Sequence, residues 1–296
     1  MSDAGITWLL VHAGKEKLEK IIPVADKYNI EIHAWIWTMN RGDADTSWLS
    51  VNRLGKSLAE EKAYVEYYKF MCPALPEVKD FISEKFSELA KTKGLAGIHM
   101  DYIRYVDVIL PVGLQPKYGL EQDSIMPEFD YGYHPYMCEL YEEETGTDPF
   151  SIKDSVEYQK WLDFRLNELN KTVWMLRDQV RNDGLKISAA VFPTPEMSKK
   201  MVRQDWASWD LDYYFPMVYH NFYNKSFDWI TQVMKENKAA IPDSIKIFCG
   251  LYLPALQNNN DLQKAIKAAM DGEADGVTLF SFGSLNEYML KQLKSQ

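Results

Sequence analysis

Short apolar stretches alternate with segments of helical period along this chain. Seven stretches are rich in β-branched and aromatic residues and have the length of buried strands. They cover residues 6–12, 31–37, 97–101, 186–192, 213–219, 246–252 and 276–282. Helical spacing of apolar residues predicts helices at residues 15–28, 77–93, 155–182, 228–238, 261–271 and 285–294. This alternation predicts an α/β fold in which residues 1–296 form one TIM-like (β/α)8 barrel.

One strand of an eight-stranded barrel is missing from this count. Either the barrel lacks or rearranges its first strand, or a strand lies in a segment that otherwise reads as loop. Residues 63–70 are the best candidate for such a strand. An open barrel is the less favourable alternative, because an unpaired strand edge invites pairing with another chain.

Two connections are much longer than ordinary loops of a compact domain. They cover residues 38–75 and 102–147, and both leave the carboxyl end of a predicted strand, where barrel enzymes build their active sites. We therefore expect both to form walls of a substrate cleft. The second contains MPEFDYGYHPYM, which makes Asp130, Tyr133 and His134 candidate substrate-binding residues.

Charge and composition narrow the class of ligand. The formal net charge is -10 and no cluster of Lys and Arg occurs, which argues against nucleic acid as a partner. No stretch approaches the ~18 apolar residues of a membrane span, and the amino-terminal residues do not read as a signal peptide. Aromatic residues make up 14% of the chain, and Trp and Tyr suit the apolar faces and hydroxyl rims of sugar rings. The pattern predicts a carbohydrate partner and leaves the oligomeric state open.

Asp101 is the first candidate for chemistry. It ends the apolar stretch GIHMD, where folding alone would favour an apolar residue or a turn former, and Arg104 follows closely enough to keep a carboxylate ionised. The alternative is an Asp that caps a helix or pairs with Arg104. Glycosidic cleavage normally needs a second carboxyl group, and Glu196 in AAVFPTPE is the best candidate for a general acid, although it also suits the start of a helix.

Aromatic and polar residues at other strand ends complete the expected site. Trp35 and Trp37 alternate with His33 on one face of their strand, and Tyr252 ends a later strand. Tyr219, His220 and Asn221 end another strand and offer donors and acceptors for sugar hydroxyls. His33, His99 and His220 lack metal-binding spacing, so core histidines are favoured over a metal site. No nucleotide-binding glycine loop or GxSxG elbow occurs, and we expect no cofactor.

Five stretches, taken together and in order, resemble the bacterial family-10-like glycosyl hydrolases, which are α/β barrels related to the hydrolase domain of poly-N-acetylglucosamine-processing proteins. The stretches are IEIHAWIWTMN, CPALPEVKDFI, AGIHMDYIRY, LDYYFPMVYHNFY and GVTLFSFGSL. The segment EFDYGYHP resembles a Bacteroidetes-type subgroup of that family.

The resemblance implies roles for several residues and a location for the protein. Asp101 would be the catalytic carboxylate with Arg104 as its partner, and the natural protein would be periplasmic or secreted. The site would be lined by His33, Trp35, Tyr219 and His220. Two departures stand out: Ala96 replaces a frequent Asp of the signature, and the strand and helix that usually precede the stretch matching residues 6–12 are not in this sequence.

The sequence thus predicts a glycoside hydrolase that cleaves O-glycosidic bonds of an oligo- or polysaccharide. Asp101 would serve as nucleophile or base and Glu196 as acid. Two alternatives remain open: a carbohydrate-binding barrel without catalysis, and a metal-dependent deacetylase or amidohydrolase with an ion near His33, His99 and Asp101. The distance between the two carboxyl groups would discriminate between catalysis and simple binding.

Overall fold

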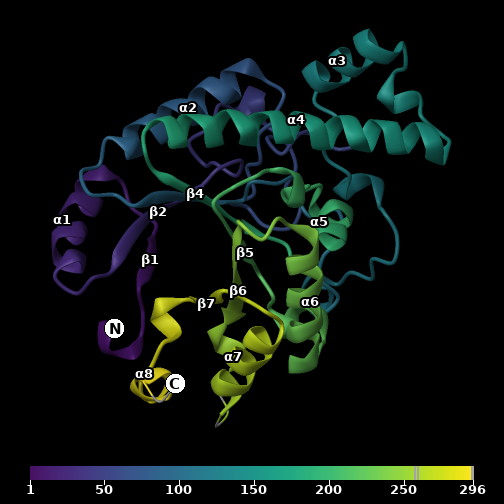
Figure 1. The fold of residues 1–296 in the computed structure, drawn as a ribbon. Coiled ribbons are helices and arrows are strands. Elements are labelled where there is room, and N and C mark those ends of the chain that lie inside the picture. Colours follow the sequence, from purple (N-terminus) through teal and green to yellow (C-terminus); the bar gives the residue numbers. More distant parts are fainter. Residues whose placement is uncertain (257, 259, 295–296) are drawn as a thin grey trace.

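The computed structural model describes residues 1–256, 258 and 260–294 of the chain, and its centre is a parallel sheet. The strands pair in chain order, each with its sequence neighbours, so the sheet curls into a half-barrel (Figure 1). Its seven strands are β1 (Trp8–Val11), β2 (Glu31–Trp37), β3 (Gly97–Asp101), β4 (Lys186–Val191), β5 (Tyr213–Pro216), β6 (Lys246–Tyr252) and β7 (Gly276–Phe280). The predicted α/β barrel class is therefore confirmed, as a half-barrel.

Helices cover the outside of the sheet, because each strand returns to the next through a helical crossover. Figure 1 shows α4 as the longest of them, reaching past the sheet to the side where α3 lies. Asp154 begins α4 by accepting hydrogen bonds from two backbone N–H groups of its first turn. The helices are α1 (Lys15–Asp26), α2 (Pro76–Ala90), α3 (Pro135–Thr145), α4 (Ser155–Asn182), α5 (Pro195–Val202), α6 (Phe227–Ala240), α7 (Asp261–Asp271) and α8 (Glu287–Lys294).

Close packing at the start of β3 fixes the strand that carries Asp101. A Cβ atom at Gly97 would lie 2.5 Å from the backbone oxygen of Lys186 and 2.5 Å from Nδ1 of His33. Glycine is therefore required where β3 passes between β2 and β4. Ile98 and Met100 are fully buried, so Asp101 is the first residue of β3 that retains some exposure.

The barrel stays open between β1 and β7, because in the described residues β1 pairs only with β2, and β7 only with β6. The expectation of a strand at residues 63–70 is wrong, since that segment forms turns and its Phe70 makes a single antiparallel bridge to Asn40. Below the opening, α8 lies against the amino-terminal residues, and Lys294 is 3.6 Å from Asp3. Figure 1 shows both ends of the chain there.

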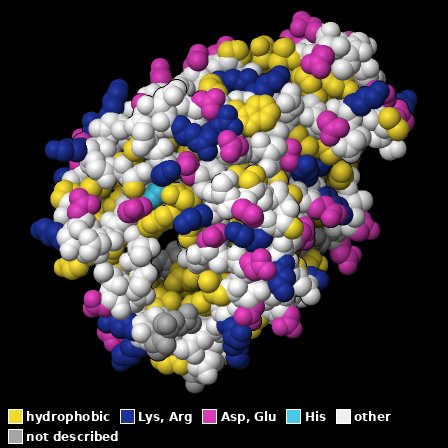
Figure 2. Space-filling model, in the orientation of Figure 1, with side chains coloured by type: hydrophobic (Ala, Val, Ile, Leu, Met, Phe, Trp, Pro, Cys, Tyr) yellow, Lys and Arg dark blue, Asp and Glu magenta, His cyan; other side chains and the backbone are white. Residues whose placement is uncertain are grey.

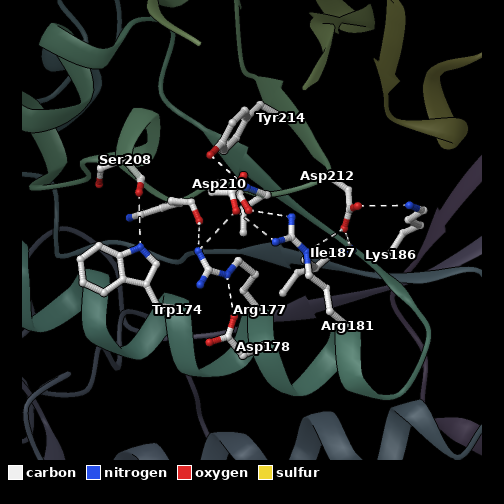
Figure 3. Close-up of polar contacts among 12 residues, drawn as sticks. Trp174, Arg177, Asp178, Arg181, Lys186, Ile187, Ser208, Asp210, Asp212 and Tyr214 are labelled. Carbon is white, nitrogen blue, oxygen red and sulfur yellow. Dashed lines mark hydrogen bonds and ion pairs between the residues drawn. The ribbon is translucent and has the colours of Figure 1, made fainter. Parts of the chain in front are cut away.

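Polar contacts hold the amino ends of the strands to α4 (Figure 3). Asp212, which precedes β5, accepts hydrogen bonds from the backbone N–H of Ile187 at 3.0 Å and from Lys186 at 3.2 Å. Arg181 of α4 is 3.1 Å from Asp210. These side chains are partly exposed, so each pair contributes at most about 1 kcal/mol. They lie at the edge of the sheet opposite to the one at which Asp101 ends its strand.

The two long connections lie together above the carboxyl ends of the strands. A bridge between Asn52 and Tyr131 joins them. The second connection contains α3 as well as two short 3-10 helices, so it is better ordered than a loop. No helix in the part of the chain that the structure describes is long and apolar enough to cross a membrane.

Candidate active site

A cavity of about 610 Å³ opens at the carboxyl ends of the strands and runs down the inside of the half-barrel. Asp101, Trp35 and Tyr219 line it, together with Arg104. Figure 2 shows this face hollowed between the elements labelled β1 and β7 in Figure 1, with hydrophobic side chains around the opening. The structure thus brings four of the predicted site residues into one cavity.

The Asp101 carboxyl group is held in place by two hydrogen bonds. The Trp35 indole Nε1–H donates to Oδ2 at 3.0 Å, and the Tyr102 backbone N–H donates to Oδ1 at 2.7 Å. Burial raises the pKa of Asp101, and these hydrogen bonds and the charge of Arg104 only partly oppose the effect. Tyr102 has a φ of 50°, a strained value for a non-glycine residue, as is frequent at functional sites.

Arg104 lies in the same cavity but does not pair with Asp101. Its guanidinium donates to the backbone oxygen of Tyr105 at 2.8 Å and to Asp107 at 3.1 Å. Its Cζ lies 5.1 Å from the ring centre of Phe70 and 5.2 Å from that of Tyr102, within cation–π range. Arg104 therefore acts on Asp101 only through its electric field, and its direct partner is Asp107.

Aromatic side chains form a wall on one side of Asp101. The ring centre of Trp37 is 4.9 Å from that of Tyr102 and 5.9 Å from that of Tyr67. Tyr67 comes from the first long connection and is 51% exposed. This wall offers flat faces at the rim of the cavity, as sugar recognition requires.

A second aromatic wall lies on the other side, at the ends of β5, β6 and β7. Tyr219 and Phe280 stack at 6.1 Å with an interplanar angle of 18°, and Tyr252 is 5.4 Å from Tyr219. Trp35 meets Phe280 edge-on at 6.0 Å, which joins this wall to Asp101. Burial and the nearby Asp101 carboxylate raise the pKa of Tyr219, so its hydroxyl stays protonated and can donate a hydrogen bond.

Glu196 lies outside this cavity. It is an exposed residue of the first turn of α5 and lines a separate groove on the outer surface, between α4 and α5, with Lys199 and Asp205. Pro195, the second proline of its stretch, begins a helix there behind the cap residue Thr194. The structure therefore does not bring Glu196 and Asp101 together, and the carboxyl pair expected from the sequence is not formed.

Asp130 and Tyr133 are buried beneath the second long connection and have structural partners. Asp130 has no exposed surface and lies 2.8 Å from Arg165 and 3.3 Å from Arg203. Tyr133 donates to Asp130 at 3.3 Å. Burial alone would raise the pKa of Asp130, but the two guanidinium groups outweigh it and lower the pKa to about 2. Substrate cannot reach either side chain in this arrangement.

The remaining predicted side chains also lie away from the cavity surface. His134 caps α3 and contacts the Ser47 carbonyl oxygen at 2.9 Å. His220 packs against Phe227 at 4.9 Å, next to Asn221 in the same 3-10 turn. His220 and Asn221 were expected at the end of a strand, but β5 ends at Pro216 and both residues lie in the 3-10 turn that follows.

His33 stands inside the barrel, below the cavity. It stacks on Trp8 at 4.9 Å, and burial lowers its pKa to about 4. His99 contacts Ser188 Oγ at 2.9 Å, and burial lowers its pKa to about 3. Both are thus neutral core histidines near pH 7. Within the described ranges no group of three or more His, Cys, Asp or Glu side chains is arranged to hold a metal ion.

Some residues at the site escaped the sequence analysis. His12 follows β1, and its ring lies 5.6 Å from that of Trp35 and 5.7 Å from that of Trp37. Tyr67 and Asp107 come from the two long connections. The high density of Tyr in AYVEYYKF indicates an aromatic surface, whereas no local sequence pattern marks Asp107 as a site residue.

Comparison with known proteins gives one family and several distant relatives. The family model of the glycosyl hydrolase-like 10 family matches residues 120–267, half of the chain. The glycosyl hydrolase YngK of Bacillus subtilis (strain 168) is 23% identical over an alignment of 274 positions that covers 84% of this chain and 47% of YngK. The chain therefore spans about half the length of this curated relative.

Solved glycosidase structures have a similar fold. The glycoside hydrolase domain of PgaB (BpsB) from Bordetella bronchiseptica superposes with a TM-score of 0.71 at 12% identity, over 99% of this chain and 84% of that one. The catalytic domain of β-amylase from Paenibacillus polymyxa superposes with a TM-score of 0.61 at 11% identity, over 93% and 82% of the two chains. At these identities the likeness shows the fold alone.

Proposed function

The chain belongs to the glycosyl hydrolase-like 10 family, and we propose that it hydrolyses O-glycosidic bonds of an oligo- or polysaccharide in the cavity that Asp101 lines. One observation carries this proposal. Asp101 is a half-buried carboxyl group that has no ion-pair partner among the described residues, and it lies between two aromatic walls at the carboxyl ends of barrel strands. Barrel enzymes build active sites at this edge, and carboxyl groups carry most glycoside hydrolysis.

The environment of Asp101 suits proton transfer to a glycosidic oxygen. A carboxyl group whose pKa is raised by burial retains its proton closer to neutral pH and can act as a general acid. The Trp35 and Tyr102 hydrogen bonds fix the orientation of both oxygens. Trp37 and Tyr219 offer rings on either side for the apolar faces of sugar units.

The test compares the parent protein with Asp101→Asn and with a matched control, Asp163→Asn. Asp163 is an exposed carboxylate on α4 that lines the outer groove. Asn keeps the shape of Asp101, and its single oxygen can still accept one of the two hydrogen bonds, so the variant should fold. Hydrolysis is measured as release of reducing ends from a panel of oligo- and polysaccharides, and glycan binding is measured separately by calorimetry.

We expect Asp101→Asn to lose about 10³-fold or more in kcat while glycan binding persists, and Asp163→Asn to match the parent. Full activity of Asp101→Asn would refute the proposal. A parent that binds glycans and cleaves none would instead indicate a carbohydrate-binding barrel. Release of acetate without new reducing ends, abolished by a chelator, would indicate a metal-dependent deacetylase.

A further inference from the structure

A second carboxyl group lines the cavity of Asp101. Among the described residues, the carboxylates that line it are Asp101 and Asp107, which lies six positions further along the second long connection. Most glycoside hydrolases use two carboxyl groups. One protonates the leaving oxygen, and the other attacks the anomeric carbon or activates a water molecule. With Glu196 on the outer surface, Asp107 is the remaining candidate for the second role.

The Asp107 side chain is fixed by contacts to one of its two oxygens. Oδ2 accepts a hydrogen bond from the Tyr68 hydroxyl at 2.8 Å and from the Arg104 guanidinium at 3.1 Å. Oδ1 accepts no hydrogen bond from the described side chains, and it is not among the fully enclosed polar atoms. The carboxylate is therefore held by one oxygen, and no hydrogen bond from the described side chains occupies the other, in a residue that is 3% exposed and lines the cavity.

The two carboxyl groups have opposite electrostatic environments. Asp107 contacts a guanidinium, and this guanidinium has no other carboxylate within ion-pair distance among the described residues. Within the described part of the chain, the Asp101 carboxyl group accepts hydrogen bonds only from an indole N–H and a backbone N–H, and burial raises its pKa. One carboxyl group beside a cation and a second one without such a contact are arranged as a nucleophile and a general acid need to be. Arg104, the ion-pair partner of Asp107, also acts electrostatically on Asp101.

We propose that Asp107 is the nucleophile of this site and that Asp101 is its general acid. Oδ1 of Asp107 forms a bond to the anomeric carbon while the bond from that carbon to the leaving oxygen breaks, and the Asp101 proton passes to that oxygen. Water then attacks the same carbon, its proton returns to Asp101, and the Asp107 carboxylate is released. This assignment rests on the proposed function, because it presupposes that the protein cleaves glycosides.

Activated leaving groups separate the two roles. The parent, Asp101→Asn, Asp107→Asn and the control Asp163→Asn are compared on an oligosaccharide that the parent cleaves and on the 2,4-dinitrophenyl glycoside of the same sugar. Dinitrophenolate leaves without protonation, so Asp101→Asn should lose about 10³-fold in kcat/KM on the oligosaccharide and less than about tenfold in kcat/KM on the aryl glycoside, a parameter that reports bond cleavage and not the later water step. Asp107→Asn should lose about 10³-fold or more on both.

Rescue by a small anion distinguishes a chemical role of Asp107 from a structural one. In Asp107→Ala, sodium azide should restore cleavage of the aryl glycoside at least about tenfold, with a glycosyl azide as the product, because the anion occupies the space of the carboxylate and attacks the anomeric carbon in its place. Circular dichroism checks that each variant is folded. If both Asp107 variants fail to fold, Tyr68→Phe keeps the carboxylate and removes one of its hydrogen bonds, and kcat should fall about tenfold with KM unchanged.

Each outcome decides the assignment. A folded Asp107→Asn that retains more than a tenth of the parent's activity would overturn it, as would a folded Asp107→Ala that azide leaves inactive, or an unchanged kcat in Tyr68→Phe. In each of these cases the proposed function would still stand if Asp101→Asn loses the hydrolysis that the parent shows. A parent inactive on every glycan would overturn both.

Discussion

The Asp130 carboxylate is buried and faces two guanidinium groups, and replacement by Asn removes its negative charge. Asp130 and Arg165 have no exposed surface and Arg203 has 1%. Besides the two ion pairs, Asp130 accepts a hydrogen bond from the Tyr158 hydroxyl at 2.7 Å. The variant therefore leaves two buried cations without a counter-charge, which should be strongly destabilising.

The size of the effect follows from the pKa of Asp130. A decrease from 3.8 to about 2, at ~1.36 kcal/mol per unit, corresponds to about 2 kcal/mol of folding free energy at neutral pH. Loss of one partner from a buried ion pair typically costs about 3–5 kcal/mol, because the remaining charge stays buried. We expect Asp130→Asn to lower the free energy of unfolding by about 3 kcal/mol at pH 7.

The pH dependence has a definite sign. The folded pKa of Asp130 lies below its unfolded value, so its contribution is present above about pH 4 and is lost as the pH falls towards 2. The difference between parent and variant should therefore shrink over this range.

Urea unfolding followed by tryptophan fluorescence measures the free energy at each pH, with Asp163→Asn as the exposed control, expected within about 0.5 kcal/mol of the parent. A loss below about 1 kcal/mol for Asp130→Asn at pH 7 would refute the structural role. So would a raised KM with unchanged stability, which would support the sequence-based hypothesis that Asp130 binds substrate.

Three further predictions follow from single contacts. Gly97→Ala should destabilise the fold by about 2 kcal/mol or more and lower the melting temperature, because its Cβ would lie 2.5 Å from the Lys186 backbone oxygen; an unchanged melting temperature would contradict this. Trp35→Phe removes a hydrogen bond that lowers the pKa of Asp101, so the limb of the pH–kcat/KM profile that belongs to Asp101 should move to higher pH. An unchanged profile would show that Trp35 does not influence the pKa of Asp101. Glu196→Gln should retain activity within about twofold and stability within about 0.5 kcal/mol, whereas a loss like that of Asp101→Asn would restore Glu196 as the acid.

Local pattern in the sequence was sufficient for the elements and for the placement of Asp101. The predicted ranges 31–37, 97–101 and 246–252 coincide with β2, β3 and β6, and 155–182 coincides with α4. These segments are apolar runs or long periodic helices whose structure depends mainly on neighbouring residues. A parallel strand ends at the active-site edge of a barrel whatever its neighbours are, so the position of Asp101 at that edge was readable too.

Only the tertiary structure decided which residues far apart in the sequence contact one another. Asp130, Asp101 and Asp107 are all acidic residues at or after the end of β3. One is neutralised by Arg165, which is 35 positions away, one is held by Trp35, and one is paired with Arg104. Burial and counter-charge set the role of a carboxyl group, and both depend on which segments fold against it. The sequence by itself determined the parallel α/β barrel class and Asp101 at its edge. The tertiary structure decided that the barrel stays open between β1 and β7, and the packing of the long connections decided which other carboxyl group shares the cavity.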